Sequence, residues 1–215
     1  MQYKIQNGAV AFGADVILKN VNFDIKNTEK IAIVGRNGCG KTVLFKIICG
    51  LLTPTSGEVY FDNKKIGKDI DFPEDCGVII ENPGFLYGLS GFKNLKLLAS
   101  INNKIGDKEI RESMELVGLD SESNIKVKGY SLGMKQKLAI AQAIMEKPKV
   151  LILDEPMNSL DEESVSRIRD ILFDLKNKGI TILISSHIKE DIEILSDEVY
   201  KVENKTVNKI IERQN

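Results

Sequence analysis

A glycine-rich stretch that ends in lysine and threonine carries the clearest chemical signal in the sequence. It matches the pattern G-x-x-x-x-G-K-S/T in full and reads Gly35-Arg36-Asn37-Gly38-Cys39-Gly40-Lys41-Thr42. Glycines let backbone N–H groups converge on one anion, and a helix that starts near Lys41 adds the positive end of its dipole. Lys41 can reach the β- and γ-phosphates of a nucleotide, and the Thr42 hydroxyl can ligate Mg²⁺. The stretch predicts a phosphate-binding loop; the alternative is a tight glycine turn that binds nothing.

Two adjacent acids form the second feature that can do chemistry. Asp154 and Glu155 follow the apolar run Val150–Leu153, which reads as a buried strand. Buried carboxylates are costly unless they are compensated, and a bound Mg²⁺ would compensate Asp154. Glu155 would then face the γ-phosphate and polarise an attacking water, a contribution of about 10²–10⁴ in rate. The alternative is an acid pair that caps a strand-to-helix turn.

The elements that must position these residues alternate between strands and helices. Lys30–Val34 is a short apolar run that feeds the glycine-rich loop, and the helix after the loop can end at Gly50. A helix from about Glu162 to Lys178, capped by Asp161, leads to a second buried run at Thr181–Ser185. This order predicts an α/β fold around a parallel sheet.

Two regions depart from this alternation. In the first third of the chain, Val21–Ile25 alternates and Glu58–Phe61 follows a turn rich in helix and strand breakers, so we expect strands and turns. From about Gly91 to Met145 the periodicity is helical, and it is broken at Gly106, Gly118 and Gly129. This periodicity predicts a helical block inserted into the α/β fold.

Composition limits the class of protein. The 215 residues are 42% hydrophobic, which suits one compact domain. The 30 basic and 31 acidic residues give a net charge of −1, so no broad field attracts nucleic acid and we expect no nucleic-acid partner.

The three cysteines, Cys39, Cys49 and Cys76, are expected to be reduced thiols of a cytoplasmic protein. No apolar run approaches the roughly 20 residues that span a bilayer, so work at a membrane would need a spanning partner.

A third motif narrows the family. The stretch Tyr130-Ser131-Leu132-Gly133-Met134-Lys135-Gln136-Lys137 resembles the ABC signature, usually L-S-G-G-Q, and lies one helix before the acidic strand. Asn158–Asp161 resembles the family's D-loop, His187 stands where the family has its switch histidine, and Phe12 is placed like the aromatic that stacks on adenine. Taken singly, Ser131 can be a helix N-cap, His187 a surface residue and Phe12 part of the core. Together the motifs resemble an ABC-type ATPase over essentially the whole chain.

The resemblance implies a role for each matching residue. The expected nucleotide contacts are Phe12, Gly35, Arg36, Asn37, Gly38, Cys39, Gly40, Lys41, Thr42, Val43, Glu81, Ser131 and Gly133. The expected catalytic residues are Glu155 as hydrolytic base, His187 at the γ-phosphate and Lys41. The expected Mg²⁺ ligands are Thr42, Asp154 and Glu81. The implied cofactors are ATP and Mg²⁺, and the implied reaction is hydrolysis of ATP to ADP and phosphate.

The resemblance also implies an architecture and partners. It implies a P-loop NTPase with a RecA-like parallel sheet, an N-terminal antiparallel β subdomain, and a helical subdomain inserted at about 82–142 of a single domain, 1–215. Ser131 and Gly133 would complete the site of a second subunit, so ATP would join a head-to-tail homodimer. The helical subdomain would dock onto a separate membrane permease, which places the chain peripherally on the inner face of the cell membrane.

Four positions depart from the usual family pattern. Val43 replaces a second hydroxyl, Leu132 and Met134 replace a glycine and a glutamine of the signature, and Glu81 replaces a glutamine. A carboxylate at position 81 can accept from water or ligate Mg²⁺ but cannot donate as an amide does. This combination resembles the bacitracin and lantibiotic-immunity branch, which implies export of a peptide antibiotic or another amphiphilic substrate.

Other functions remain open at this stage. A non-transport ABC ATPase would need long coiled coils or tandem ATPase domains, and no sustained heptads lie between Lys41 and Asp154. A small-molecule kinase would need an arginine-bearing lid where this chain carries the signature. A binding module without turnover is opposed by Glu155. An ABC ATPase that serves an importer, or an exporter of another substrate class, stays an alternative.

Overall fold

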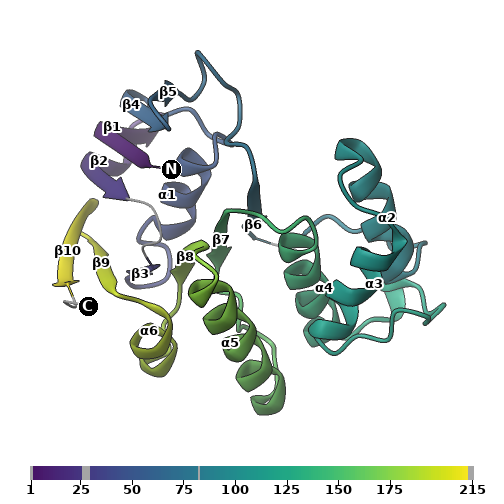
Figure 1. Cartoon of the computed structure of the whole chain (residues 1–215). Coiled ribbons are helices and arrows are strands. Elements are labelled where there is room, and N and C mark those ends of the chain that lie inside the picture. The colour runs from purple at the N-terminus through teal and green to yellow at the C-terminus, as the bar shows by residue number, and fades with distance from the viewer. Residues whose placement is uncertain (1, 26–29, 82, 213–215) are drawn as a thin grey trace.

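The computed structural model describes residues 2–25, 30–81 and 83–212, so Asn82, which opens the expected helical subdomain, lies outside the described residues. A four-stranded antiparallel sheet has the order β2-β1-β4-β5. Its strands are β1 Tyr3–Phe12, β2 Asp15–Ile25, β4 Ser56–Phe61 and β5 Lys64–Lys65. This sheet occupies the upper left of Figure 1.

A six-stranded sheet has the order β10-β9-β3-β8-β7-β6. Strands β9, β3, β8, β7 and β6 run parallel to one another, and β10 at the edge is antiparallel to β9. The bounds are β3 Lys30–Val34, β6 Cys76–Ile79, β7 Val150–Asp154, β8 Thr181–Ser185, β9 Glu198–Glu203 and β10 Thr206–Glu212. The predicted parallel sheet is therefore confirmed, with one antiparallel strand at its edge.

The helices fall into two groups. Those of the sheet are α1 Lys41–Ile48, α5 Glu162–Asn177 and α6 Lys189–Leu195, and those of the helical region are α2 Gly91–Asn102, α3 Asp107–Leu116 and α4 Leu132–Ile144. The helices of the second group stand together at the right of Figure 1, with the 3₁₀ turn Val127–Gly129 beside them in the chain. The predicted insertion of helices into an α/β fold is confirmed. Among the described residues, no helix combines the length and apolar character that crossing a membrane requires.

The alternating direction of side chains along the central strands divides the core into two clusters. Ile31 and Ile33 of β3, with Ile152 of β7, pack with α1 and the antiparallel sheet. Leu151 and Leu153 of β7 face the other way and pack with α4 and α5. The central strands are thus buried on both faces, which explains why their sequences are continuous apolar runs.

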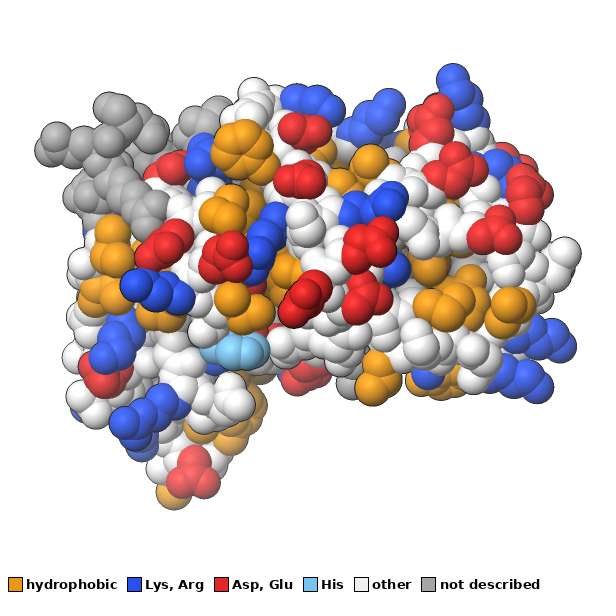
Figure 2. Space-filling model, turned by 90° about the horizontal axis from the view of Figure 1, so that it is seen from below, with side chains coloured by type: hydrophobic (Ala, Val, Ile, Leu, Met, Phe, Trp, Pro, Cys, Tyr) orange, Lys and Arg blue, Asp and Glu red, His pale blue; other side chains and the backbone are white. Residues whose placement is uncertain are grey.

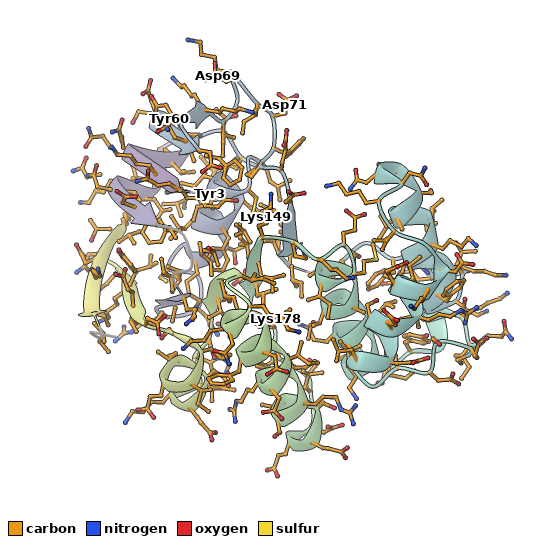
Figure 3. The ribbon with its side chains drawn as sticks, viewed as in Figure 1. Tyr3, Tyr60, Asp69, Asp71, Lys149 and Lys178 are labelled. Carbon is orange, nitrogen blue, oxygen red and sulfur yellow. The ribbon has the colours of Figure 1, made fainter. Side chains whose placement is uncertain are left out.

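Polar contacts join the separate layers. Tyr3 of β1 lies with its hydroxyl 2.9 Å from Sγ of Cys76 at the start of β6, and burial raises the pKa of that thiol to about 11. Asp75 accepts from Lys104, which follows α2, at 2.8 Å and pairs with Lys149 at 3.0 Å. Figure 3 labels Tyr3 and Lys149. These contacts hold the antiparallel sheet and the helical region against the same end of β6 and β7.

Candidate active site

The glycine-rich loop connects β3 directly to the N-terminus of α1. Gly38 and Gly40 have φ values of 76° and 110°, which disfavour residues with a side chain. Gly40 is the N-cap of α1 and supplies no side-chain hydrogen bond, and no acid lies in the first turn. The first N–H groups of α1 are therefore left to an anion such as a phosphate.

The side chain of Lys41 returns over this loop. It is 7% exposed, and its Nζ donates to the carbonyl of Gly35 at 2.9 Å. The same Nζ lies 3.6 Å from Oε1 of Glu155. A buried ammonium held over a helix N-terminus adds a positive charge where phosphates would bind.

A chain of hydrogen bonds links the loop to the ends of two parallel strands. The Thr42 hydroxyl donates to Oδ2 of Asp154, the last residue of β7, at 2.5 Å. The Ser185 hydroxyl, at the end of β8, donates to Oδ1 of the same carboxylate at 2.5 Å. Both oxygens of Asp154 are thus oriented by hydroxyl groups. Ser185 reaches one oxygen because the carboxyl ends of β7 and β8 lie side by side, and Thr42 reaches the other from the first turn of α1.

The chain continues through Glu155 to His187. The backbone N–H of Glu155 donates to the Ser185 hydroxyl at 2.8 Å, and Nδ1 of His187 lies 2.9 Å from Oε2 of Glu155. Glu155 has a φ of 48°, a rare conformation for a residue with a side chain. Within the described part of the chain, Oε1 of Glu155 is buried without a hydrogen-bond partner. This oxygen faces Nζ of Lys41 at 3.6 Å but accepts no hydrogen bond from a described residue, so it can accept a proton from a bound water.

Lys41, Thr42, Asp154 and Glu155 open onto one cleft of about 680 Å³, whereas Ser185 and the predicted catalytic residue His187 lie outside its lining. Its lining is Phe12, Ile17, Asn37, Gly38, Gly40, Lys41, Thr42, Val43, Glu81, Gln136, Asp154, Glu155, Asn158 and Ser159. A larger hollow of about 830 Å³ lies at the opposite ends of the strands, near Lys149 and Lys178, and contains none of the predicted site residues. Both lysines are labelled in Figure 3.

Several predicted residues lie outside this lining. The Ser131 hydroxyl caps α4 by accepting from the N–H of Met134 at 3.1 Å, as the N-cap alternative has it. A Cβ on Gly133 would lie 2.9 Å from the carbonyl oxygen of Ser159, so this glycine allows close packing on the D-loop. Gly35, Arg36 and Cys39 also lie outside the lining, and a Cβ added to Gly35 would lie 2.6 Å from the Cys39 sulfur. Their predicted nucleotide contacts remain predictions.

Two predicted residues lie at the rim of the cleft. Phe12 is 54% exposed, so it is not part of the core and its ring is free to stack. Glu81 pairs with Lys46 of α1 at 2.7 Å and is 62% exposed. The carboxylate is therefore paired with α1 and not with Thr42 or Asp154. The role of Glu81 as an Mg²⁺ ligand stays a prediction.

Sequence reasoning missed two residues that shape the site: Ile17 lines the cleft, and Ser185 orients both Asp154 and Glu155. Asn158 and Ser159, expected only as part of the D-loop, also line the cleft. Gln136, quoted only as part of the signature, also lines it and donates to the carbonyl of Pro156 at 2.9 Å. A serine that ends a buried apolar strand was a usable signal for Ser185, since a hydroxyl there needs a polar partner.

The residues present fit Mg²⁺ bound together with a nucleotide. Among the described residues, no group of three or more His, Cys, Asp or Glu side chains could hold a metal by itself. Mg²⁺ commonly binds through one or two carboxylates plus substrate phosphates and waters. The adjoining Thr42 hydroxyl and Asp154 carboxylate match that incomplete protein donor set.

Comparison with known proteins gives close relatives. Residues 18–158 match the family model described as ABC transporter. The uncharacterized ABC transporter ATP-binding protein YybJ of Bacillus subtilis (strain 168) is 44% identical over 181 residues, covering 84% of this chain and 83% of YybJ. The lantibiotic transport ATP-binding protein SrtF of Streptococcus pyogenes is 38% identical over 195 residues, covering 90% of this chain and 83% of SrtF. The bacitracin transport ATP-binding protein BcrA of Enterococcus faecalis is 38% identical over 201 residues, covering 92% of this chain but 65% of BcrA.

Solved structures agree with the sequence relatives. The dimeric structure of MJ0796, a bacterial ABC transporter cassette, superposes with a TM-score of 0.89 at 25% identity, covering 99% of this chain and 100% of that one. A dimeric post-hydrolysis state of MJ0796 bound to ADP and Pi gives a TM-score of 0.88 at the same identity and coverage. The family match, the relatives and the fold lead to one conclusion. The chain belongs to the ABC transporter family, as an ATP-binding and ATP-hydrolysing subunit.

Proposed function

We propose that the chain hydrolyses MgATP in this cleft and thereby powers export of a peptide antibiotic or another amphiphilic substrate through a separate permease. The observation that carries the catalytic part is the continuous series of hydrogen bonds from Thr42 through Asp154, Ser185 and Glu155 to His187. It joins a phosphate-binding loop, a metal-binding carboxylate and a candidate base in one rigid unit.

Each part of this unit has a distinct task. The N–H groups of α1 and Nζ of Lys41 bind the phosphates, and Thr42 with Asp154 would hold Mg²⁺, which would supply positive charge to the phosphates. Glu155 orients and deprotonates the attacking water. His187 binds the Glu155 carboxylate and also contacts the γ-phosphate. Phe12 stacks on the adenine ring.

The active form is a head-to-tail homodimer with ATP between its subunits. Ser131 is exposed and lies outside the cleft of its own chain, and the adjacent Leu132 is 70% exposed. An apolar side chain exposed beside a helix N-terminus suits a surface that is buried when a second copy closes on it. The dimeric structures of the MJ0796 cassette support a dimer.

A permease docks where the helical region meets β6. A groove of about 660 Å³ there includes Phe72, Leu98 and Ile101, of which Phe72 is 58% and Ile101 76% exposed. Exposed apolar side chains on both walls suit an amphipathic segment of a membrane protein. The chain is then peripheral on the inner face of the membrane. Basic and acidic side chains are interspersed on the molecular face that Figure 2 shows, and the net charge of −1 supports the expectation of no nucleic-acid partner.

The substrate class rests on the relatives. SrtF is named for lantibiotic transport and BcrA for bacitracin transport, and both align over most of this chain. Glu81 and the Leu132–Met134 signature support the same branch.

Reconstitution tests the proposal. The chain is combined in proteoliposomes with the integral-membrane protein encoded beside its gene, and ATPase activity is measured with and without a lantibiotic or bacitracin. We expect stimulation by the peptide, lost in Ile101→Asp, whose free-chain ATPase activity is unchanged. Failure of every such peptide to stimulate, with intact basal activity, would contradict the substrate class and leave the ATPase assignment in place.

A further inference from the structure

A fully buried carboxylate lies behind the loop that carries His187. Asp191, in the first turn of α6, is 0% exposed. Its Oδ1 accepts from Nε of Arg169 at 2.7 Å and lies 2.7 Å from Nη2 of the same guanidinium. Arg169 belongs to α5 and its side chain is 15% exposed, so the pair joins α5 to α6 inside the molecule. The guanidinium also pairs through Nη1 with the exposed Glu190 at 2.9 Å, whereas the Asp191 carboxylate is wholly buried and cannot turn to water.

The second oxygen of Asp191 serves the active-site loop. Oδ2 accepts from the Ser186 hydroxyl at 2.8 Å, and that hydroxyl in turn accepts from the backbone N–H of Ile188 at 3.0 Å. Ser186 is 3% exposed, whereas the His187 side chain between these two residues is 62% exposed. The Ser186 hydroxyl therefore fixes the backbone on either side of His187, whose own side chain is too exposed to be held by packing.

The residues on either side of this turn face the catalytic groups. Ser185 binds Asp154 and the N–H of Glu155, and His187 binds the Glu155 carboxylate. Of Ser185, Ser186 and His187, only Ser186 bonds to the buried Asp191–Arg169 pair and not to a catalytic group. The backbone of His187 is thus fixed from behind by a different set of contacts from those that hold Glu155.

We propose that Asp191 and Ser186 are positioning residues for ATP hydrolysis, which hold His187 at its hydrogen-bonding distance from Glu155 by anchoring the β8–α6 loop to Arg169 of α5. This inference rests on the proposed role of His187. Because α5 begins at Glu162, directly after the D-loop Asn158–Asp161, the Arg169–Asp191 pair also ties α5 and the D-loop before it to the loop that carries His187. The two loops at the nucleotide site then move as one body.

Ser186→Ala is the decisive variant, since it removes the hydroxyl and leaves the buried pair intact. We expect kcat to fall about 10-fold, because small displacements of catalytic groups are costly, with KM for ATP unchanged within about twofold. Asp191→Asn, where it folds, shows the same selective loss. Ser196→Ala is the matched control: Ser196 is 2% exposed and bonds to the Ile192 carbonyl at the other end of α6, so its loss should lower stability without lowering kcat.

A double-mutant cycle separates positioning from general stability. Single-turnover rates are measured for Ser186→Ala, His187→Ala and the double variant. We expect Ser186→Ala to have no further effect once His187 is removed. If His187→Ala is slow but Ser186→Ala is not, or if the two losses multiply, this inference is overturned and the proposed site stands. If His187→Ala turns over like the parent chain, the proposed role of His187 and this inference are both overturned.

Discussion

Oγ1 of Thr42 and Oδ2 of Asp154 lie 2.5 Å apart, although 112 positions separate the two residues in the sequence. The bond joins the first turn of α1 to the end of β7. A single divalent cation can therefore contact a hydroxyl and a carboxylate that are already held together, with the phosphates completing its coordination.

Thr42→Val tests this pairing, since it preserves shape and removes the hydroxyl. We expect the Mg²⁺ concentration that gives half-maximal ATPase activity to rise about 10-fold or more, in the range typical for lost groups around a metal. Thr42→Ser keeps the hydroxyl and should stay near the parent value. An equal Mg²⁺ requirement in all three proteins would remove Thr42 from the metal site.

Lys41→Ala should abolish measurable ATP binding, because it removes a buried positive charge from a loop shaped around phosphates. Calorimetric titration with ATP is the measurement. Lys46→Ala is a suitable control, since Lys46 lies on the same helix and pairs with exposed Glu81. Retained affinity in Lys41→Ala would mean that the loop does not bind phosphate as described.

Glu81→Gln should keep at least partial ATPase activity and near-parent stability. The amide retains an acceptor oxygen, and the lost pair with Lys46 is largely exposed, where ion pairs contribute about 0–1 kcal/mol. Steady-state ATPase assays at several Mg²⁺ concentrations decide the matter. Complete loss of Mg²⁺-dependent turnover would show that the carboxylate itself is required.

The three cysteines should differ in their reaction with a maleimide near neutral pH. Burial raises the pKa of Cys49 and raises that of Cys76 to about 11, so both remain thiols, which react slowly. Cys39 lies in the loop and is only partly buried. We expect mass spectrometry to find Cys39 modified first, with loss of ATPase activity that Cys39→Ala resists. Faster labelling of Cys49 or Cys76 would contradict this order.

The sequence was sufficient for the elements whose residues repeat a strong local pattern. Lys30–Val34 and Thr181–Ser185 are strands with the predicted bounds, and Asp161 caps α5 by accepting from the N–H of Ser164 at 2.8 Å. Buried parallel strands are continuous apolar runs, so their ends are visible in the sequence. The strands β6, β9 and β10 were not predicted. β6 has only four residues, β10 is largely exposed, and charged residues interrupt the apolar pattern of β9, so their pairing depends on neighbours more than on local preference.

Contacts across the sheet could not be derived in the same way. The bonds of Ser185 to Asp154 and of Ser186 to Asp191 depend on the register of β7 beside β8 and on where α6 packs. No spacing in the sequence encodes the side on which Cys39 packs against Gly35, or the pairing of Glu81 with Lys46. These contacts arise only when the whole fold brings distant residues together.

The measurement that tests the account most directly is the behaviour of Glu155→Gln with ATP. The amide keeps the shape of Glu155 but cannot act as a base, so we expect MgATP binding to persist while hydrolysis slows about 10²-fold or more. Gel filtration with ATP should then show a stable dimer for the variant and mostly monomer for the parent chain. Hydrolysis at the parent rate, with no dimer trapped by ATP, would contradict the assignment of Glu155 as the base at an ATP-joined interface.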